Sequence, residues 1–415
     1  MPSSISSSDA ILAPTAPGVI AADGVAAPGA SLFERPGFVR LTASDRPGVA
    51  QPVPERDIPP QPWGRILLGA LLLFLALMAA WENQWRQFGA QPGYRNSNGA
   101  WAEQRRRIAT GEGDRTVLIG SSRVLFDVQL DQWQAATGER PIQLALEGTT
   151  PVPVLEDLAA DPAFTGRLLV GVAPDLFFSG FAYRGAAIKH YHQQGPSQRI
   201  GHWLSKHALE PYFAFYDPDF ALPTVLERQP WWPLRPELRR HMDVRKLMVL
   251  GADRDTHLWS KVETDAQYRA LAQSIWAQHF TGPPPPPMRT PEGRAALFGA
   301  QVDRAAKAVA VLRARGVPVV FVRPPSDGAY YAFEQAALPR AQTWDLLLQR
   351  TGAPGIHFED HRALQGLELP EWSHLTHADA RRFTTALAPL VVREFERQDH
   401  ARQQAAATAT AARTP

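Results

Sequence analysis

The sequence predicts an α/β protein with a doubly wound parallel sheet, a long and mainly helical insertion, and one N-terminal transmembrane helix. Short apolar runs at residues 117–119 and 168–172 alternate with segments of helical periodicity, as parallel strands covered on both faces do. Residues 175–288 interrupt that alternation. Residues 63–85 form one long apolar stretch near the N-terminus.

The apolar stretch is long enough to cross a bilayer. At a rise of about 1.5 Å per residue, a helix over 63–85 spans a hydrocarbon core of about 30 Å. Trp63 and Arg65 stand at one end and Trp81 and Trp85 at the other, where membrane interfaces favour tryptophan and long basic side chains. A buried soluble helix and a cleaved signal peptide are the alternatives. The absence of a polar stripe disfavours the first and the long upstream tail disfavours the second.

The charges that flank this helix give only a slight preference for one orientation in the membrane. Residues 1–62 are rich in Ala, Pro, Ser and Gly, which predicts a disordered tail. Basic residues precede the span and also follow it, with a small excess before it, namely Arg46, Arg56 and Arg65 against Arg86 and Arg95. The positive-inside rule therefore favours a cytoplasmic N-terminus, with everything from about residue 86 outside the cytoplasm.

Composition excludes several classes of function. The chain has 415 residues and 45% hydrophobic residues, enough for a large core, and its net charge of +2 argues against nucleic acid as a partner. Cysteine is absent, which rules out disulfides, thiolate zinc sites and a cysteine nucleophile.

The α/β domain is expected over residues 98–397. Ordered along the chain, we expect a helix over 98–111, a strand at 117–119, a helix over 124–136, a strand at 142–146, a helix opening at 154 and a strand at 168–172. Beyond the insertion we expect a helix over 293–315, a strand at 317–322, a helix over 344–351 and a strand at 356–358. Residues 398–415, rich in Ala, Gln and Thr, predict a disordered C-terminal tail.

The insertion, residues 175–288, is crowded with aromatic and histidine side chains, among them Trp231 and Trp232. An insertion of this length beside a sheet is typical of a lid or a partner-binding surface, and ordinary packing of a helical subdomain also accounts for such a composition.

A serine follows the first predicted strand. Gly120-Ser121-Ser122 comes directly after the apolar run, and ligands of open α/β sheets bind beyond the carboxyl ends of the strands. A simple turn or a helix N-cap is the alternative interpretation of the same residues.

A histidine with an orienting carboxylate precedes the last helix. Glu371 stands three residues before His374, a spacing that lets the carboxylate hold one ring nitrogen and leave the other free to take a hydroxyl proton. A helix-capping or core histidine is the plain alternative. A metal site assembled from histidines, namely His357, His361, His374 and His377, is not expected, because no carboxylate on a helix face completes it.

The order of these motifs resembles the SGNH (GDSL-like) hydrolase superfamily over residues 115–395 with the insertion left out. The resemblance implies a flavodoxin-like fold, with Ser122 as the nucleophile and Glu371 and His374 as its partners. Gly148 matches the second family block and would donate its N–H to an oxyanion hole. The third block lacks the family's Asn, reading Gly171-Val172-Ala173-Pro174-Asp175. Losing one such donor costs about 3 kcal/mol.

Two arginines beside strand ends are possible substitutes for the missing donor. Arg123 and Arg323 can place charged N–H groups there, although arginines in such positions also form ordinary salt bridges. We expect neither a metal nor an organic cofactor.

The anchor, the extracytoplasmic domain and the stretch Arg323-Pro324-Pro325-Ser326 resemble bacterial proteins that work beside membrane-bound O-acyltransferases, such as alginate O-acetylation factors and the D-alanine transfer protein of teichoic acids. That resemblance implies a serine O-acyltransferase acting on a cell-surface polysaccharide at the periplasmic side of the inner membrane. The implied partners are the membrane, a glycan acceptor and a multi-spanning O-acyltransferase. An esterase of the same fold and a catalytically silent scaffold are the alternatives.

Overall fold

The structure is a computed structural model that describes residues 60–228, 246–281 and 284–411. Residues 1–59 of the tail predicted over 1–62 lie outside the described residues, as do Trp231 and Trp232. The chain divides into two units, residues 1–71 and 72–415, and the α/β domain belongs entirely to the second.

The apolar stretch forms α1 (Trp63–Gln87), a helix long and apolar enough to cross a membrane. The large apolar side chains of this helix from Ile66 to Leu77 are exposed. The predicted helix is thus confirmed, and it extends two residues past Trp85.

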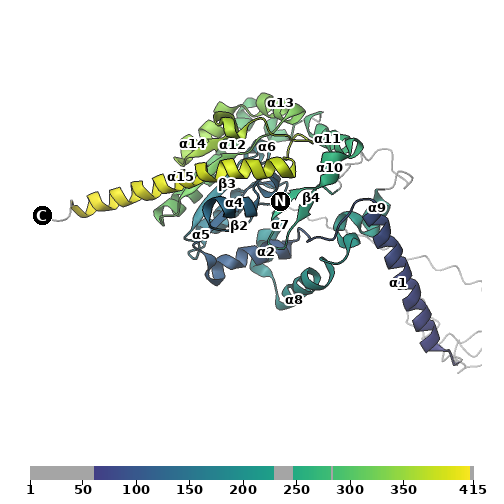
Figure 1. Cartoon of the computed structure of the whole chain (residues 1–415). Helices are drawn as coiled ribbons and strands as arrows, with labels where there is room; N and C mark the ends of the chain where they lie inside the picture. The colour runs from purple at the N-terminus through teal and green to yellow at the C-terminus, as the bar shows by residue number, and fades with distance from the viewer. Residues whose placement is uncertain (1–59, 229–245, 282–283, 412–415) are drawn as a thin grey trace, which may run out of the picture. The chain divides into compact units, whose positions relative to one another are not determined.

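A five-stranded parallel sheet forms the centre of the domain (Figure 1). Its strands are β1 (Thr116–Ile119), β2 (Ile142–Gln143), β3 (Arg167–Gly171), β6 (Val319–Arg323) and β7 (Gly355–His357). Their order is β2-β1-β3-β6-β7. All five strands run parallel, but the order in which they follow one another across the sheet reverses between β1 and β3, and the crevice at such a switch point is where open α/β sheets bind ligands. The predicted α/β class and the parallel sheet are confirmed.

Helices cover both faces of this sheet because successive strand residues point to opposite sides. One face carries α2 (Asn98–Arg107), α5 (Val152–Ala160), α6 (Pro174–Ser179), α12 (Pro291–Ala314) and α14 (Trp344–Thr351). The other carries α3 (Ser122–Asp127), α4 (Leu130–Thr137) and α15 (His377–Ala411). Along β1, Val117 and Ile119 join the first core and Leu118 joins the second.

The expected helix over 124–136 is wrong in one respect, because it is two helices, α3 and α4. Val128 takes an extended conformation between them, and the hydroxyl of Thr384 accepts the N–H of Gln129 at 2.9 Å and donates to the carbonyl of Asp127 at 3.0 Å. A side chain of α15 therefore satisfies the backbone groups that the break exposes.

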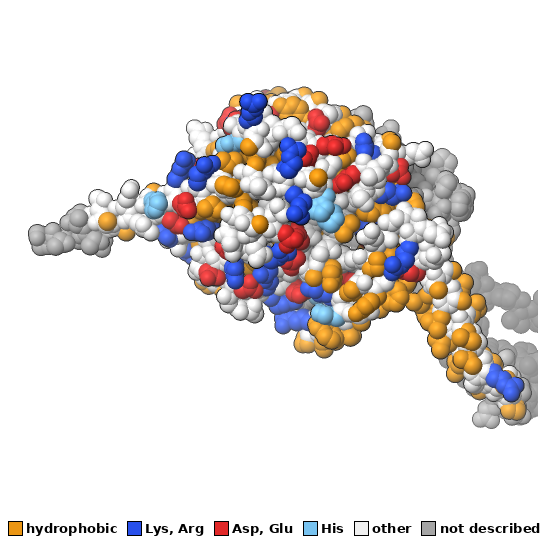
Figure 2. Space-filling view, viewed as in Figure 1, with side chains coloured by type: hydrophobic (Ala, Val, Ile, Leu, Met, Phe, Trp, Pro, Cys, Tyr) orange, Lys and Arg blue, Asp and Glu red, His pale blue; other side chains and the backbone are white. Residues whose placement is uncertain are grey.

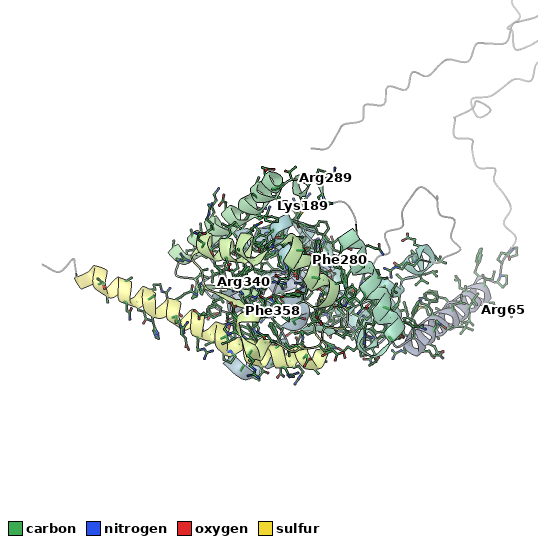
Figure 3. The ribbon with its side chains drawn as sticks, turned by 90° about the horizontal axis from the view of Figure 1, so that it is seen from above. Arg65, Lys189, Phe280, Arg289, Arg340 and Phe358 are labelled. Carbon is green, nitrogen blue, oxygen red and sulfur yellow. The ribbon has the colours of Figure 1, made fainter. Side chains whose placement is uncertain are left out.

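The expected disordered tail over 398–415 is also wrong over residues 398–411, which continue α15. Gln398 bonds both backbone groups of Val319 at 3.2 Å, and Arg402 donates to the carbonyl of Gly316 at 2.6 Å. Alanine, frequent here, has the highest helix propensity. The end of α15 projects beyond the other helices of the domain (Figures 1 and 3).

The insertion is mainly helical, as predicted, and also contains a small antiparallel hairpin. Besides α6 it holds α7 (Ala186–Gln193), α8 (Pro196–Leu204), α9 (Leu222–Glu227), α10 (Ser260–Thr264) and α11 (Ala266–Thr281), with the hairpin β4 (Met248–Leu250) and β5 (Thr256–Leu258). Trp259, Val262 and Tyr268 join the core on the α15 side of the sheet. The sequence missed α13 (Gly328–Ala337), which follows β6.

Candidate active site

Glu371 and His374 form a buried pair in the loop before α15. The carboxylate oxygen Oε1 of Glu371 accepts the ring Nδ1–H of His374 at 2.7 Å and its backbone N–H at 2.6 Å. Trp372 between them has a left-handed backbone (φ 74°), which tightens the turn that brings the two side chains together. Within the described chain, Nε2 of His374 is buried and has no hydrogen-bond partner. This arrangement fixes the tautomer that leaves Nε2 able to accept a proton.

Ser122 opens α3, and the same helix supports the histidine. The ring of Phe126, one turn after Ser122, stacks on the His374 ring with centroids 4.3 Å apart. Ser121 is buried and caps the helix, its Oγ accepting the N–H of Arg123 at 3.4 Å, whereas Ser122 is partly exposed. The structure thus places His374 against the helix that begins with Ser122. Among the residues described, no hydrogen bond joins the Ser122 hydroxyl to His374 Nε2.

Gly148 lies at the same edge of the sheet. Leu146 donates its N–H to the carbonyl of Gly120 at 2.9 Å, so Gly148 stands two residues past the last contact with the β1 segment. Its φ is +57° and a Cβ there would lie 3.2 Å from Cβ of Tyr183, so this position requires glycine. In the described structure no hydrogen bond connects Gly148 directly to Ser122.

Arg123 and Arg323 converge on one carboxylate, Glu334 of α13. Nη1 of Arg123 lies 2.8 Å from one carboxylate oxygen and Nη2 of Arg323 lies 2.7 Å from the other. Burial opposes ionisation of Glu334, but the two guanidinium groups outweigh it and lower the pKa of this carboxyl. Both arginines therefore form salt bridges, one of the two interpretations that the sequence left open.

Arg123 also reaches toward the histidine loop. Its Nε donates to the hydroxyl of Ser373 at 3.3 Å, directly before His374. Its Nη1 is engaged in the ion pair with Glu334, whereas its Nη2 is buried and makes no hydrogen bond to any described residue. Nη2 is therefore the donor that a ligand or a water molecule entering the site can meet.

Asp175 ends the segment 171–175, in which the resemblance lacks an Asn. The hydroxyl of Tyr330 donates to its Oδ2 at 2.6 Å, and the Tyr330 ring lies under the Arg123 guanidinium at 4.8 Å. Burial raises the pKa of Asp175, and nearby Arg123 only partly offsets this effect. Its Oδ1 is buried and unpaired within the described residues.

Sequence reasoning missed two further residues, one that contacts the pair and one that bonds the residue after His374. Asp127, fully buried, accepts the N–H of Leu375 at 3.0 Å, and burial raises the pKa of its carboxyl to about 7 against the attraction of His374. Trp276 of α11 donates its indole N–H to Oε2 of Glu371. No local pattern marks these residues. The one available signal is that Asp127 is a carboxylate five residues after Ser122, at the end of the same helix.

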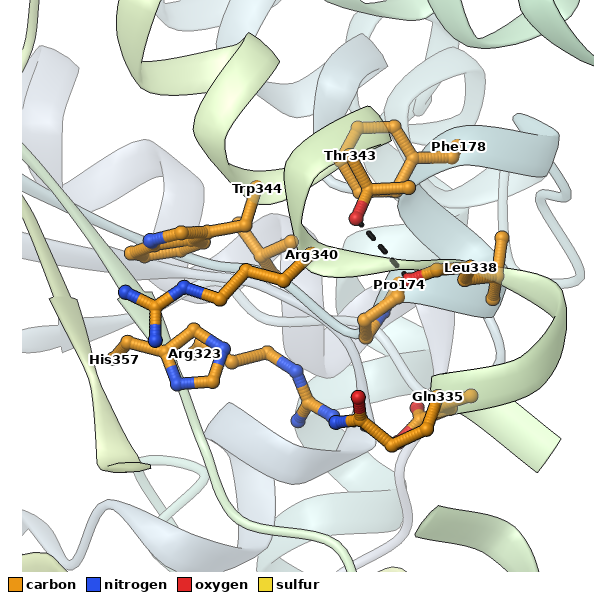
Figure 4. A pocket seen from close by; sticks show the side chains of 11 residues that line it. Pro174, Phe178, Arg323, Gln335, Leu338, Arg340, Thr343, Trp344 and His357 are labelled. Atoms are coloured by element: carbon orange, nitrogen blue, oxygen red, sulfur yellow. Dashed lines mark hydrogen bonds and ion pairs between the residues drawn. The ribbon is translucent and has the colours of Figure 1, made fainter. Parts of the chain in front are cut away.

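One small cavity lies at this edge of the sheet. A pocket of about 20 Å³ lies beside Arg323 and Glu334, enough for one water molecule, and is also lined by His357 and Arg340 (Figure 4). Burial and the two neighbouring guanidinium groups lower the pKa of His357 to about 3. A larger cavity, about 460 Å³, opens at the opposite edge, where Thr116 and Arg167 begin their strands.

The histidines considered for a metal site do not converge. His377 stacks on His257 with ring centroids 4.0 Å apart, and His357 lies beside Trp344. No group of three or more histidine, aspartate or glutamate side chains suited to a metal ion occurs among the described residues.

Comparison with protein-family models, curated proteins and solved structures finds no match to this chain.

Proposed function

We propose that this protein is a membrane-anchored serine acyltransferase of the SGNH type. The observation that carries the proposal is the buried pair of Glu371 and His374, held by its loop against the helix that begins with Ser122. An acid that orients an imidazole beside a serine is the arrangement that activates a hydroxyl for acyl transfer.

In the proposed reaction Ser122 Oγ attacks the carbonyl carbon of an acyl donor and passes its proton to Nε2 of His374. His374 then gives that proton to the departing group, which leaves an acyl-serine. An acceptor hydroxyl next attacks the acyl-serine and loses its proton to His374, which returns the proton to Ser122 as the new ester departs. Glu371 stays ionised and orients the ring throughout.

The acyl oxygen needs donors, and three candidates lie at this edge. Backbone N–H groups at the start of α3 and at Gly148 are the first two, by resemblance. Asp175 is the third, because its raised pKa favours a neutral carboxyl that can donate as an amide does. The unpaired Oδ1 of Asp175 supports this assignment.

The acceptor and the partner come from the resemblance alone. We propose a cell-surface polysaccharide as acceptor and a multi-spanning O-acyltransferase as acyl supplier. α1 would serve as a single-pass anchor that holds the domain on the extracytoplasmic side of a bacterial inner membrane. An esterase that removes acyl groups from such a polymer would use the same residues.

A catalytically silent scaffold is the second candidate, and one observation favours it. Ser122 and His374 are not hydrogen-bonded in the described structure, although such bonds are often long before substrate binds. A scaffold would keep its binding role when Ser122 is replaced.

The test uses the full chain in detergent with a chromogenic acetyl ester and a serine-directed phosphonate probe. We expect the wild type to be labelled once, and S122A to lose both label and turnover. S121A is the matched control, because it removes only the neighbouring cap hydroxyl and should keep the label. A wild type that takes no label and turns over no ester would favour the scaffold.

A further inference from the structure

The helix α8 presents its apolar side chains to solvent. Ile200, Trp203 and Leu204 follow the i, i+3, i+4 spacing of one helix face and are 60%, 58% and 49% exposed. Figure 2 shows hydrophobic side chains gathered at the lower edge of the molecule, over the α8 of Figure 1. A helix of a soluble domain normally turns this face toward the core.

The polar side of α8 is the side attached to the domain. Nε2 of His202 lies 2.9 Å from the Glu103 carboxylate, and Nζ of Lys206, just beyond the helix, lies 2.7 Å from it. The His202 ring packs so closely over α2 that a Cβ on Gly99 would lie 2.8 Å from it. The Lys206–Glu103 ion pair and the contact between His202 and Glu103 therefore hold α8 with its apolar face outward.

A second short helix repeats the pattern. Leu222 and Leu226 of α9, four residues apart on one helix face, are also exposed. The segment between α8 and α9 contacts the last turns of α1. Glu82 accepts the N–H groups of Ala214 and Phe215 at 3.0 Å.

Two more contacts complete this attachment. Arg86 donates to the carbonyl of Tyr212 at 3.1 Å, and the ring of Trp85 stacks on Phe220 at 4.6 Å. If α1 spans the bilayer, these turns lie where the chain leaves it. Leu204, the last residue of α8, precedes Tyr212 by eight residues.

We propose that the exposed residues of α8 and α9 form a second membrane contact, inserted into the lipid interface beside the end of α1. We name this set the interfacial face; it comprises Ile200, Trp203, Leu204, Leu222 and Leu226. Amphipathic helices with tryptophan and leucine on one side bind such interfaces, and tryptophan favours the headgroup level. The proposal rests on the proposed anchoring by α1. With two contacts to the bilayer, the domain has a fixed orientation relative to the membrane.

The experiment exploits a chain without cysteine. Single variants L204C and L222C, made in the full-length protein and labelled with a bimane fluorophore, are reconstituted in phosphatidylcholine and phosphatidylglycerol bilayers. Brominated phosphatidylcholine reports lipid contact, and aqueous iodide reports water contact. L75C in α1 is the lipid control, and V311C, an equally exposed position on α12, is the water control.

We expect L204C and L222C to be quenched by brominated lipid as L75C is, and shielded from iodide. If both behave like V311C while L75C is quenched, the interfacial face is overturned and the anchor stands. Shielding from both quenchers would also overturn lipid as the occupant and indicate a protein instead. If brominated lipid does not quench L75C, both the membrane insertion of α1 and this proposal are contradicted.

Discussion

The candidate site concentrates buried polar atoms that have no protein partner in the described chain. His374 Nε2, Asp127 Oδ2 and Asp175 Oδ1 all belong to this group. Each unpaired buried polar group costs about 1–3 kcal/mol, so these three atoms require a compensating use. Bound water or a polar substrate can supply the missing hydrogen bonds, because Ser122 is partly exposed.

At Asp175 the proposed donor role predicts opposite effects for two substitutions. D175N keeps an acceptor for the Tyr330 hydroxyl and supplies an amide donor, so we expect ester turnover at or above that of the wild type. D175A removes the donor, and we expect a loss on the order of 100-fold. Steady-state kinetics with the acetyl ester measures both. Wild-type turnover by D175A would exclude the role.

At Asp127 the raised pKa predicts a pH dependence of stability. Burial lifts this pKa to about 7, above the unfolded value of about 3.9, so the folded protein binds the proton more tightly. The free energy of unfolding therefore falls as pH rises from about 4 to 7. In D127N, which cannot ionise and can keep the bond from Leu375, this fall should disappear.

Thermal or denaturant unfolding of wild type and D127N between pH 5 and pH 8 tests this expectation. The wild type should lose up to about 3 kcal/mol relative to the variant over that range. Parallel pH profiles for the two proteins would show that Asp127 is not the group responsible.

Among the elements, α11 links the insertion to the site. Trp276 donates to Glu371, and Gln273 of the same helix donates to the carbonyl of Pro370 at 2.8 Å. Both bonds hold the carboxylate that orients His374. The insertion therefore supplies a positioning helix in addition to filling the core.

W276F should test that positioning, because it keeps an aromatic ring and removes only the indole N–H. A hydrogen bond to a charged group contributes about 1.5–3 kcal/mol, so we expect kcat to fall roughly tenfold or more. KM should stay unchanged, because the lost hydrogen bond orients the catalytic pair and does not hold the substrate. S274A is the matched control, because Ser274 lies on the same helix, is exposed and donates its hydroxyl to the carbonyl of Leu271. Equal kinetics for the two variants would contradict the assignment.

In the whole molecule the end of α1 belongs to the domain fold. Trp85 and Phe88 pack against the core on the α15 side of the sheet, and Ala90 is part of it. Lys261 Nζ lies 4.4 Å from the Phe88 ring centroid. A soluble form must therefore retain these residues.

Two fragments test this integration. A fragment of residues 95–415 lacks the partly buried rings of Trp85 and Phe88, which a fragment of residues 81–415 retains. Removing a large side chain costs about 3–5 kcal/mol where it is fully buried and less where it is partly buried, so the shorter fragment should melt roughly 5 °C lower. Differential scanning fluorimetry compares them. Equal melting temperatures would mean that α1 ends outside the fold.

Several features could be predicted from the sequence because they depend on short stretches of chain. The apolar α1, the strand runs and the three-residue spacing of Glu371 and His374 are local patterns, and the structure has each of them. Parallel strands buried on both faces need continuous apolar runs, so their positions are visible in the sequence. The order of the motifs along the chain can also be read directly from the sequence.

Tertiary structure alone decided the rest. The shared carboxylate of Glu334, the Asp175 and Tyr330 pair and the indole of Trp276 meet the site from separate elements, and nothing in the local sequence indicates such meetings. The break between α3 and α4 depends on Thr384 of α15, and the extension of α15 depends partly on contacts to Val319 and Gly316. Periodicity records which face of an element is buried. The packing of elements distant in sequence decides what that face meets, because burial favours apolar contact without specifying its partner.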